Sequence, residues 1–321
     1  MSPSLRSLAA VALGLGFAAC GSKSGLSLGF DAGAPPDAAP DAPSDAGADV
    51  SAHDASADAA DAPAEDALPP IDANVLDVVK PNNCADAAIT LVYLFSSDGK
   101  LLSFDPATLA IATIGTVACP TQLSPNSMAV DHLGVAYANF TTGEAGEIWK
   151  LSTATAKCTP TPYVPKLGFQ RFGMGFLGDQ DGGEELYITK SDGAGALARV
   201  ALPSFELDFK GDFSPPLSLC ELTSRGDGQL FALCMKNNGA TLAQVDPETA
   251  KVIGVDNLKV GNSTSAFAFA FWGGKFWIFT GNQGVGSTVT EYDPALKKET
   301  PVLSTKEVIV GAGVSTCAPI D

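Results

Sequence analysis

Residues that could carry out acid–base or nucleophilic chemistry are scarce in this chain of 321 residues. Only two histidines occur, His53 in an Asp/Ala/Pro-rich segment and His132 in the sequence Asp131-His132-Leu133-Gly134. A serine hydrolase needs a histidine beside its nucleophile, which commonly lies on a Gly-x-Ser-x-Gly turn, and residues 80–321, where a folded domain is expected, contain no such pattern. The sequence therefore favours a protein without catalysis, and we assign no catalytic residue.

The acidic residues come closest to a metal site in one short segment. In Asp179-Gln180-Asp181-Gly182-Gly183-Glu184, oxygen-bearing side chains precede two glycines, which makes Asp179, Asp181 and Glu184 the nearest candidates for calcium ligands. The rest of the twelve-residue calcium loop is missing. The segment also falls where a turn between strands is expected, so we predict a turn and neither a metal nor another cofactor.

The elements that must position these residues are short β-strands in a repeat. A strand with the pattern apolar-x-x-apolar recurs at intervals of 45 to 49 residues. Each copy follows a β-type run and a glycine-bearing connection, and three copies run into Asp-Pro, which makes a tight turn. A repeat of this length with β-rich content indicates propeller blades. The five copies begin at Leu101, Ile148, Leu197, Leu242 and Val289.

The two ends of the repeat region predict how the ring closes. The first repeat lacks an inner strand of its own, whereas residues 308–317 resemble an inner strand with nothing to follow it. A C-terminal strand that completes the first blade would remove two exposed strand edges. We therefore predict that residues 80–321 form an all-β domain, a five-bladed β-propeller closed by the C-terminal strand.

Polar side chains that stand where inner strands begin are the best candidates for ligand contacts. Asn126, Gln170, Arg171 and Ser218 would meet on the face that carries the blade-to-blade connections and the turns between second and third strands. A few placed polar groups above an apolar floor are typical of small-ligand sites. We predict that these four residues bind a glycan or a peptide. The alternative is that the loops are polar only because they face water.

Six cysteines follow Cys20, and an even number in an exported chain indicates disulfides. Two of them are equidistant from Asp227 and would face each other across a hairpin, and two lie at the ends that ring closure brings together. The remaining two would join the outer strands of the first two blades. Buried free cysteines remain the alternative, and a zinc site is disfavoured because no Cys-x-x-Cys occurs. The predicted pairs are Cys220–Cys234, Cys84–Cys317 and Cys119–Cys158.

The first 79 residues are predicted to lie outside the folded domain. Residues 1–19 contain Arg6 and an apolar stretch too short to span a bilayer, as in an export signal peptide. Residues 20–79 are rich in Asp, Ala and Pro. Twelve of the chain's 36 acidic residues lie between Asp31 and Asp77, where no Lys or Arg occurs. Such a composition has too little apolar surface to fold, so we expect a disordered tether.

The sequence Phe17-Ala18-Ala19-Cys20-Gly21-Ser22 resembles the lipobox of bacterial lipoproteins, in which the cysteine becomes the lipidated first residue. The family usually has Leu where this chain has Phe17, so ordinary signal cleavage nearby is the alternative. The resemblance implies a lipid anchor at Cys20, and two or more acyl chains hold a protein stably on a membrane. Gly21 and Ser22 favour the outer membrane of a Gram-negative bacterium.

The charge of the chain bears on its partners. The formal net charge is −17, much of it in the predicted tether. The propeller region is mildly acidic and has no basic stripe, which disfavours nucleic-acid binding. We expect a monomer whose partners are the membrane, through its lipid anchor, and a glycan or an envelope protein.

Residues 88–317 resemble the repeats of quinoprotein-like and YVTN-type bacterial propellers in strand pattern and Asp-Pro turns. Trp-Gly, the signature of quinoprotein repeats, occurs once, at Trp272-Gly273, and does not recur from repeat to repeat, so the resemblance implies no quinone cofactor. The sequence thus predicts a cell-envelope lipoprotein whose propeller is a non-catalytic binding or scaffolding module for a glycan, peptide or protein. The alternative is a metal-dependent hydrolase that resembles the calcium lactonases, with a metal site around Asp131, Asp179 and Glu221.

Overall fold

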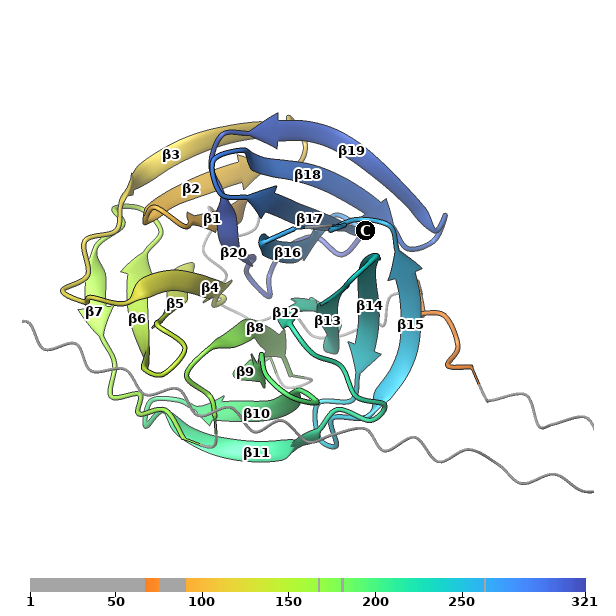
Figure 1. Ribbon diagram of the computed structural model, residues 1–321, viewed down its shortest axis with the longest axis horizontal. Coiled ribbons are helices and arrows are strands. Elements are labelled where there is room, and N and C mark those ends of the chain that lie inside the picture. Colours follow the sequence, from red (N-terminus) through yellow and green to blue (C-terminus); the bar gives the residue numbers. More distant parts are fainter. Residues whose placement is uncertain (1–66, 75–90, 167, 180–181, 263) are drawn as a thin grey trace, which may run out of the picture. The chain divides into compact units, whose positions relative to one another are not determined.

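The computed structural model describes residues 67–74, 91–166, 168–179, 182–262 and 264–321. Within these ranges the chain contains strands and no helix. The strands form five antiparallel sheets of four, arranged as the blades of a propeller (Figure 1). The predicted signal peptide, Cys20 and most of the predicted tether lie outside the described residues. The predicted all-β class and blade number are confirmed.

Each blade runs from an inner strand at the ring centre to an outer strand at the rim. From inner to outer, blade 1 contains β20 (Ile309–Gly313), β1 (Val92–Ser96), β2 (Lys100–Asp105) and β3 (Ala110–Thr116). Blade 2 contains β4 (Ser124–Val130), β5 (Val135–Thr141), β6 (Gly146–Ser152) and β7 (Cys158–Pro160). Blade 3 contains β8 (Phe172–Gly178), β9 (Glu184–Lys190), β10 (Ala196–Ala201) and β11 (Glu206–Asp212). Blade 4 contains β12 (Cys220–Arg225), β13 (Gln229–Lys236), β14 (Gly239–Val245) and β15 (Val252–Leu258). Blade 5 contains β16 (Ala266–Trp272), β17 (Lys275–Asn282), β18 (Gly286–Asp293) and β19 (Lys298–Thr305).

The ring closes through the C-terminal strand, as predicted. β20 pairs antiparallel with β1, with Tyr93 opposite Gly313 and Leu94 opposite Ala312. The five inner strands then contact one another in ring order, β20 beside β4 and beside β16 (Figure 1). Closure therefore joins segments that lie more than two hundred residues apart in the sequence.

Inner strands of neighbouring blades approach closely where they carry glycine. A Cβ atom on Gly173 of β8 would lie 2.3 Å from the carbonyl oxygen of Cys220 on β12. A Cβ atom on Gly311 of β20 would lie 2.7 Å from the backbone nitrogen of Met128 on β4. Real Cβ atoms do not come this close, so only glycine allows such an approach. This packing explains why glycine occupies these two positions of the inner strands.

The apolar core consists of five clusters, and each fills the space between two neighbouring blades. The second strand of every blade contributes one large aromatic residue at the equivalent position, and each is at least 96% buried. Aromatic side chains bury the most area per residue, so one per blade packs the wedge between sheets efficiently. These aromatic residues are Tyr93, Tyr137, Tyr187, Phe231 and Trp277.

Two of the predicted disulfides are present. Cys220 and Cys234 are register partners in β12 and β13, and their sulfurs are 2.05 Å apart. Cys119 and Cys158 link the connection after blade 1 to the outer strand of blade 2. Cys317 is also disulfide-bonded. Its predicted partner, Cys84, lies outside the described residues, so that pairing stays a prediction.

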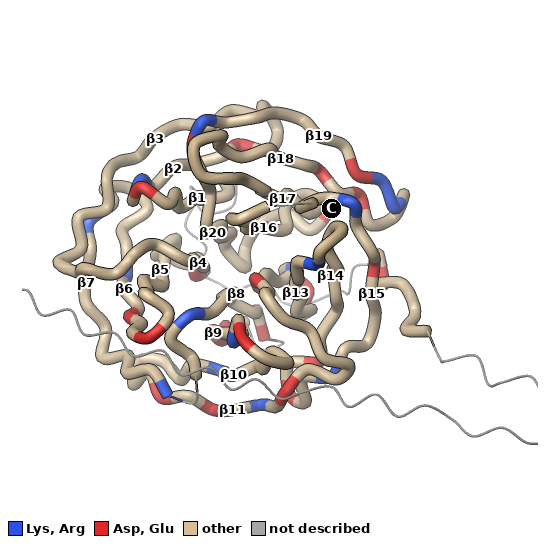
Figure 2. The backbone as a smooth tube through the Cα atoms, in the orientation of Figure 1, with Lys and Arg blue, Asp and Glu red and all other residues tan. Residues whose placement is uncertain are grey.

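Most charged residues belong to the outer strands and the turns of the backbone trace (Figure 2). Of the five described inner strands, only β12 carries charged residues, which are Glu221 near its start and Arg225 at its end. Four residues of extended chain span roughly 13 Å. The two charges therefore mark opposite ends of the ring centre.

Candidate functional site

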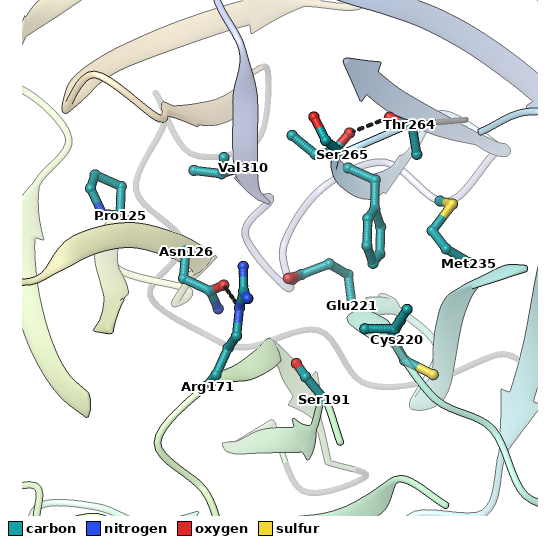
Figure 3. A pocket seen from close by; sticks show the side chains of 13 residues that line it. Pro125, Asn126, Arg171, Ser191, Cys220, Glu221, Met235, Thr264, Ser265 and Val310 are labelled. Atoms are coloured by element: carbon teal, nitrogen blue, oxygen red, sulfur yellow. Dashed lines mark hydrogen bonds between the residues drawn. The ribbon is translucent and has the colours of Figure 1, made fainter. Parts of the chain in front are cut away.

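A pocket of about 230 Å³ opens at one end of the inner strands. It lies on the face formed by the blade-to-blade connections and the turns between second and third strands, which we call the pocket face. This is the face on which a ligand site was predicted. Figure 3 shows the side chains around the pocket. Its lining residues are Pro125, Asn126, Arg171, Ser191, Leu219, Cys220, Glu221, Met235, Thr264, Ser265, Ala266, Phe267 and Val310.

Arg171 stands at the rim of the pocket, just before β8, and a chain of amides holds it. Its Nε donates to Asn126 Oδ1 at 2.9 Å, the dashed contact in Figure 3. Asn126 Nδ2 in turn donates to Asn139 Oδ1 at 2.9 Å and to the carbonyl of Phe172 at 2.8 Å. Asn139 on β5 is fully buried. A buried, bonded amide is a rigid support, so the guanidinium is fixed through Nε alone.

The two terminal guanidinium nitrogens of Arg171 make no hydrogen bond to any described residue. The Arg171 side chain is exposed, so these donors face the open part of the pocket. A guanidinium with two parallel donors matches the two oxygens of a carboxylate or phosphate. Arg171 is therefore arranged to bind an anionic group.

Glu221 forms the floor of the pocket. Its Oε2 accepts a hydrogen bond from the Ser127 hydroxyl at 2.5 Å, and the residue is only 7% exposed. The Ser127 oxygen accepts in turn from the backbone N–H of Met174 at 3.2 Å. Burial raises the pKa of Glu221 well above its usual value, while the bonds from Ser127 and Met174 and the charge of Arg171 oppose that shift.

Gly173 explains how Glu221 on blade 4 reaches Ser127 on blade 2, across blade 3. Ser127, Gly173 and Glu221 occupy equivalent positions on β4, β8 and β12, opposite Asn139, Thr189 and Leu233 on the second strands. A Cβ atom on Gly173 would lie 2.5 Å from the Cα of Glu221. Because blade 3 has no side chain there, the Glu221 side chain has room to cross it.

Apolar side chains complete the pocket. Phe267 and Met235 are half-buried, Val310 lies at the start of β20, and Leu219 is 53% exposed. Sites for drug-sized ligands usually measure 300–1,000 Å³. The pocket of about 230 Å³ therefore suits a small ligand, or one end of a larger one.

Of the four predicted ligand residues, the structure brings two together. Asn126 and Arg171 both line the pocket. Ser218 lies in a neighbouring hollow that is more open to solvent than the pocket. This hollow shares Leu219, Met235 and Thr264 with the pocket. Gln170 lines neither of these hollows, and its backbone carbonyl accepts from Asn139 Nδ2 at 3.3 Å. Gln170 is thus positioned as a support.

Sequence reasoning gave no ligand role to Phe267 or Glu221, which line the pocket, or to Asn139, which supports it. Phe267 looked like one more apolar residue of an inner strand, and Asn139 like one polar residue in a second strand. Glu221 entered only as part of a metal alternative. A signal for it exists, since it is the single acidic residue among the five inner strands described.

At the opposite end of the ring centre, Glu184 is tied to its neighbours. Its carboxylate accepts from the backbone N–H of His132 at 2.9 Å and from the Thr316 hydroxyl at 2.9 Å, and it lies 2.7 Å from His132 Nδ1. Burial raises the pKa of Glu184, and these partners oppose the shift. Asp179 Oδ1 accepts from the Gly183 N–H at 2.7 Å and closes the turn. Asp181 lies outside the described residues.

The metal alternative has no assembled site in the described part of the chain, where no group of three or more His, Cys, Asp or Glu side chains is placed to hold a metal ion. Asp131 Oδ1 accepts from the Val135 N–H at 2.8 Å, and burial raises its pKa. Glu221 is bonded to Ser127 on the pocket face. The three acids proposed for a metal enzyme therefore do not form one cluster.

Residues 67–74, which we call the arm, dock at the Arg225 end of β12. Arg225 donates from Nη1 to the carbonyl of Asp72 at 3.0 Å and from Nη2 to the carbonyl of Asn74. It also pairs with Asp227 at 2.8 Å, and its guanidinium lies 5.6 Å from the centre of the Phe231 ring. Both charged side chains are at least 98% buried. Arg225 and Asp227 of the tripeptide Arg225-Gly226-Asp227 therefore form a structural ion pair.

Further contacts hold the arm along blades 4 and 5. The Val255 N–H on β15 donates to the carbonyl of Pro69 at 2.8 Å, and Lys297 Nζ donates to the carbonyl of Ile71 at 3.3 Å. The Ile71 side chain is 3% exposed and packs into the apolar cluster between these blades. The arm thus belongs to the folded domain.

Comparisons with known proteins find likeness only among solved structures. No protein-family model matches the chain, and no curated protein matches it. TolB from Acinetobacter baumannii is 12% identical, with a TM-score of 0.40 over 67% of this chain and 52% of that one. A chain of a nidogen/laminin complex is 15% identical, with a TM-score of 0.43 over 72% of this chain and 87% of that one.

The third similar structure is a calcium-binding protein, regucalcin, from Agrobacterium tumefaciens. It is 15% identical, with a TM-score of 0.36 over 74% of this chain and 77% of that one. The chain spans about half of the length of the TolB structure. These three likenesses concern the fold alone. The described residues include no helix with the length and apolarity needed to cross a bilayer.

Proposed function

We propose that this protein is a non-catalytic binding module whose ligand occupies the pocket beside Arg171. One observation supports this most directly: Asn126, itself held by the buried Asn139, fixes Arg171 through Nε, while the two terminal nitrogens bond no described residue. The apolar walls from Phe267 and Met235 and the polar floor at Glu221 give the mixed lining that small-ligand sites use. The ligand carries an anionic group and is a glycan or peptide of the cell envelope.

The proposed location is the outer membrane, through a lipid anchor at Cys20. The lipobox-like sequence before Cys20 and the Asp/Ala/Pro-rich stretch after it support this proposal. The arm is where this stretch meets the propeller, at the Arg225 end of β12. The pocket opens at the other end of that strand, so a tethered, monomeric propeller would present it away from the membrane.

Thermal unfolding of the full chain in mild detergent tests the binding function. A ligand that binds the native state raises the unfolding midpoint by mass action. Soluble cell-wall fragments and glycans are added singly, and calcium and a chelator form separate arms. We expect one ligand class to raise the midpoint in wild type and to lose this effect in Arg171→Ala.

The matched control is Arg199→Ala, which removes another partly exposed arginine, on β10, that does not line the pocket. It should respond to ligand as wild type does. A calcium-dependent rise that survives Arg171→Ala would overturn the proposal in favour of the metal-dependent alternative. Equal ligand responses in Arg171→Ala and wild type would remove the pocket from the function.

The anchor is tested separately by Cys20→Ala. Expressed in a Gram-negative host, wild type should fractionate with the outer membrane, and the variant should move to the soluble fraction or remain unprocessed. A wild-type protein found wholly in the soluble fraction would contradict the anchor without affecting the pocket.

A further inference from the structure

We propose that the ligand group bound by the pocket is an α-amino-acid zwitterion, with its carboxylate on Arg171 and its ammonium on Glu221. This inference rests on the proposed function, because it assumes that the pocket is a ligand site. It specifies the chemistry of the ligand, namely an ammonium and a carboxylate attached to the same carbon atom, beside an apolar side chain.

The first step is the arrangement of the two charges. Figure 3 shows the Glu221 carboxyl and the Arg171 guanidinium pointing toward one another from opposite sides of the pocket. No ion pair joins them, and neither has another charged partner among the described residues. A guanidinium and a carboxylate in contact would satisfy each other. Held apart, they leave a gap that suits a ligand with the reverse order of charges.

The second step is the state of Glu221. The strands around its carboxyl, β4, β8, β16 and β20, carry no charged residue, and Arg171 is the described cation that acts on it. The Ser127 hydroxyl accepts a hydrogen bond from the Met174 N–H and can donate its own proton to an ionised Glu221. A buried carboxylate needs a counter-charge close by. A ligand ammonium would supply it at the pocket floor.

The third step concerns the anionic end of the ligand. The two free terminal nitrogens of Arg171 can receive a carboxylate in a bidentate manner, and Asn126 sets their direction through Nε. A phosphate would also satisfy the guanidinium. It would, however, bring negative charge toward Glu221, which a zwitterion neutralises with its ammonium. The pairing of Arg171 with Glu221 therefore favours an amino acid over a simple anion.

The remaining walls decide which side chain fits. Phe267, Met235, Leu219 and Val310 offer apolar surface, and Ser265 and Thr264 stand at the edge. We expect an aliphatic or aromatic side chain to pack there. The same zwitterion also occurs at the free end of a diamino acid within a cell-wall peptide, so the test separates these two sources.

Calorimetric titration and thermal unfolding of the full chain use L-leucine and L-phenylalanine as probes. The matched analogues are N-acetyl-L-leucine, which lacks the ammonium, and L-leucinamide, which lacks the carboxylate. A soluble cell-wall peptide with a free diamino-acid end forms the last arm. We expect at least one zwitterionic probe to bind, and each analogue to bind at least about tenfold more weakly, as befits the loss of a charged hydrogen bond.

Two variants separate the ends of the ligand. Glu221→Gln should weaken the zwitterion at least about tenfold while leaving N-acetyl-L-leucine unchanged, and Arg171→Gln should do the same with L-leucinamide unchanged. Arg199→Gln is the control and should bind as wild type does. Because Gln removes a buried charge without changing shape, Glu221→Gln is expected to fold, which its unfolding curve verifies.

The outcomes of these measurements separate failure of the zwitterion proposal from failure of the proposed binding function. If an acidic glycan binds through Arg171 and Glu221→Gln leaves its affinity unchanged, the zwitterion is wrong and the binding module stands. If every response is the same in Arg171→Gln and wild type, both proposals fail. Binding of the cell-wall peptide alone, abolished by acetylation of its diamino end, would support the zwitterion and assign it to the cell wall.

Discussion

Two arginines, Arg225 at one end of the ring centre and Arg171 at the other, are bonded in opposite ways. At the C-terminal end of β12, Arg225 is buried and shares its donors among Asp227 and the carbonyls of Asp72 and Asn74, with Phe231 against its face. At the pocket end, Arg171 is exposed and uses only Nε, on Asn126. One guanidinium is saturated by its own chain, and the other keeps donors for something else.

The hydrogen-bond partners of a charged side chain distinguish a structural charge from a functional one in this propeller. A buried polar network is stable when every member is satisfied, and an unsatisfied group is costly unless water or a ligand reaches it. The Arg225–Asp227 pair is buried, and the bonds from Arg225 to the carbonyls of Asp72 and Asn74 secure the arm. Arg171 is held through Nε and Glu221 through Oε2. Both residues line the pocket.

Breaking the saturated end should have the largest effect. Arg225→Ala leaves Asp227 buried without its main cation and frees the arm, which we expect to cost about 3–5 kcal/mol of unfolding free energy. Arg171→Ala, at an exposed site, should stay within about 0.5 kcal/mol of wild type. Denaturant unfolding measures both. Equal losses in the two variants would erase the proposed contrast between them.

The apolar contact of the arm should come next. Ile71→Ala removes a buried side chain between blades 4 and 5, and we expect a loss near the lower end of about 2–5 kcal/mol, because the arm can shift to fill part of the space. Val285→Ala is the matched control, since Val285 is 79% exposed. An Ile71→Ala protein as stable as the control would show that the arm adds nothing to the fold.

A smaller loss is expected at the pocket end from Gly173→Ala. The new Cβ would overlap Cys220 and Glu221, so the neighbouring strands must shift, at about 1–3 kcal/mol. The shift should also disturb the Ser127–Glu221 hydrogen bond. On the same strand, Gly178→Ala meets only the Thr316 Cβ at 3.8 Å and serves as the control. Comparable stability of the two variants would contradict the close packing.

The subtlest effect is a dependence on pH. The pKa of folded Glu221 is raised, so its protonated form favours the native state, and this contribution is full below the ordinary value of 4.5. It is lost as pH rises through the folded pKa. Glu221→Gln abolishes this titration, so wild type should lose stability relative to the variant from pH 4.5 upward. Glu144→Gln, on an exposed turn, controls for the charge change, and unfolding midpoints across this range measure the difference. A stability gap that is constant with pH would contradict the burial of Glu221.

The architecture could be predicted from the sequence because it depends on local signals repeated many times. The apolar pattern near Leu101 and its four copies, the Asp-Pro turns and the unpaired tail all indicate the same ring. In the structure, Asp246 Oδ1 and Asp293 Oδ1 accept backbone N–H bonds two and three residues ahead, which is the turn chemistry expected of them.

The site was less predictable from the sequence because it depends on which strands of different blades come into contact. Asn126 and Arg171 could be chosen because they are polar at strand starts. The position of Gln170 just before Arg171 gave no hint that its backbone, and not its side chain, would be used. The reach of Glu221 to Ser127 depends on the glycine of a third blade. Such a contact requires the ring to be built first.

The strand that completes blade 1 also has a consequence for biosynthesis. A chain is made from its N-terminus, and β1 ends at Ser96 while its inner neighbour β20 begins at Ile309. Blades 2 to 5 can each form as soon as their own consecutive strands emerge, but β1 must wait with an unpaired inner edge until residues 309–313 have been made. Bridging so long a loop adds little equilibrium cost, since that cost grows only with the logarithm of length. The burden is one of time, because a nascent protein stalled before Ile309 is an open arc in which the inner edge of β1 is unpaired.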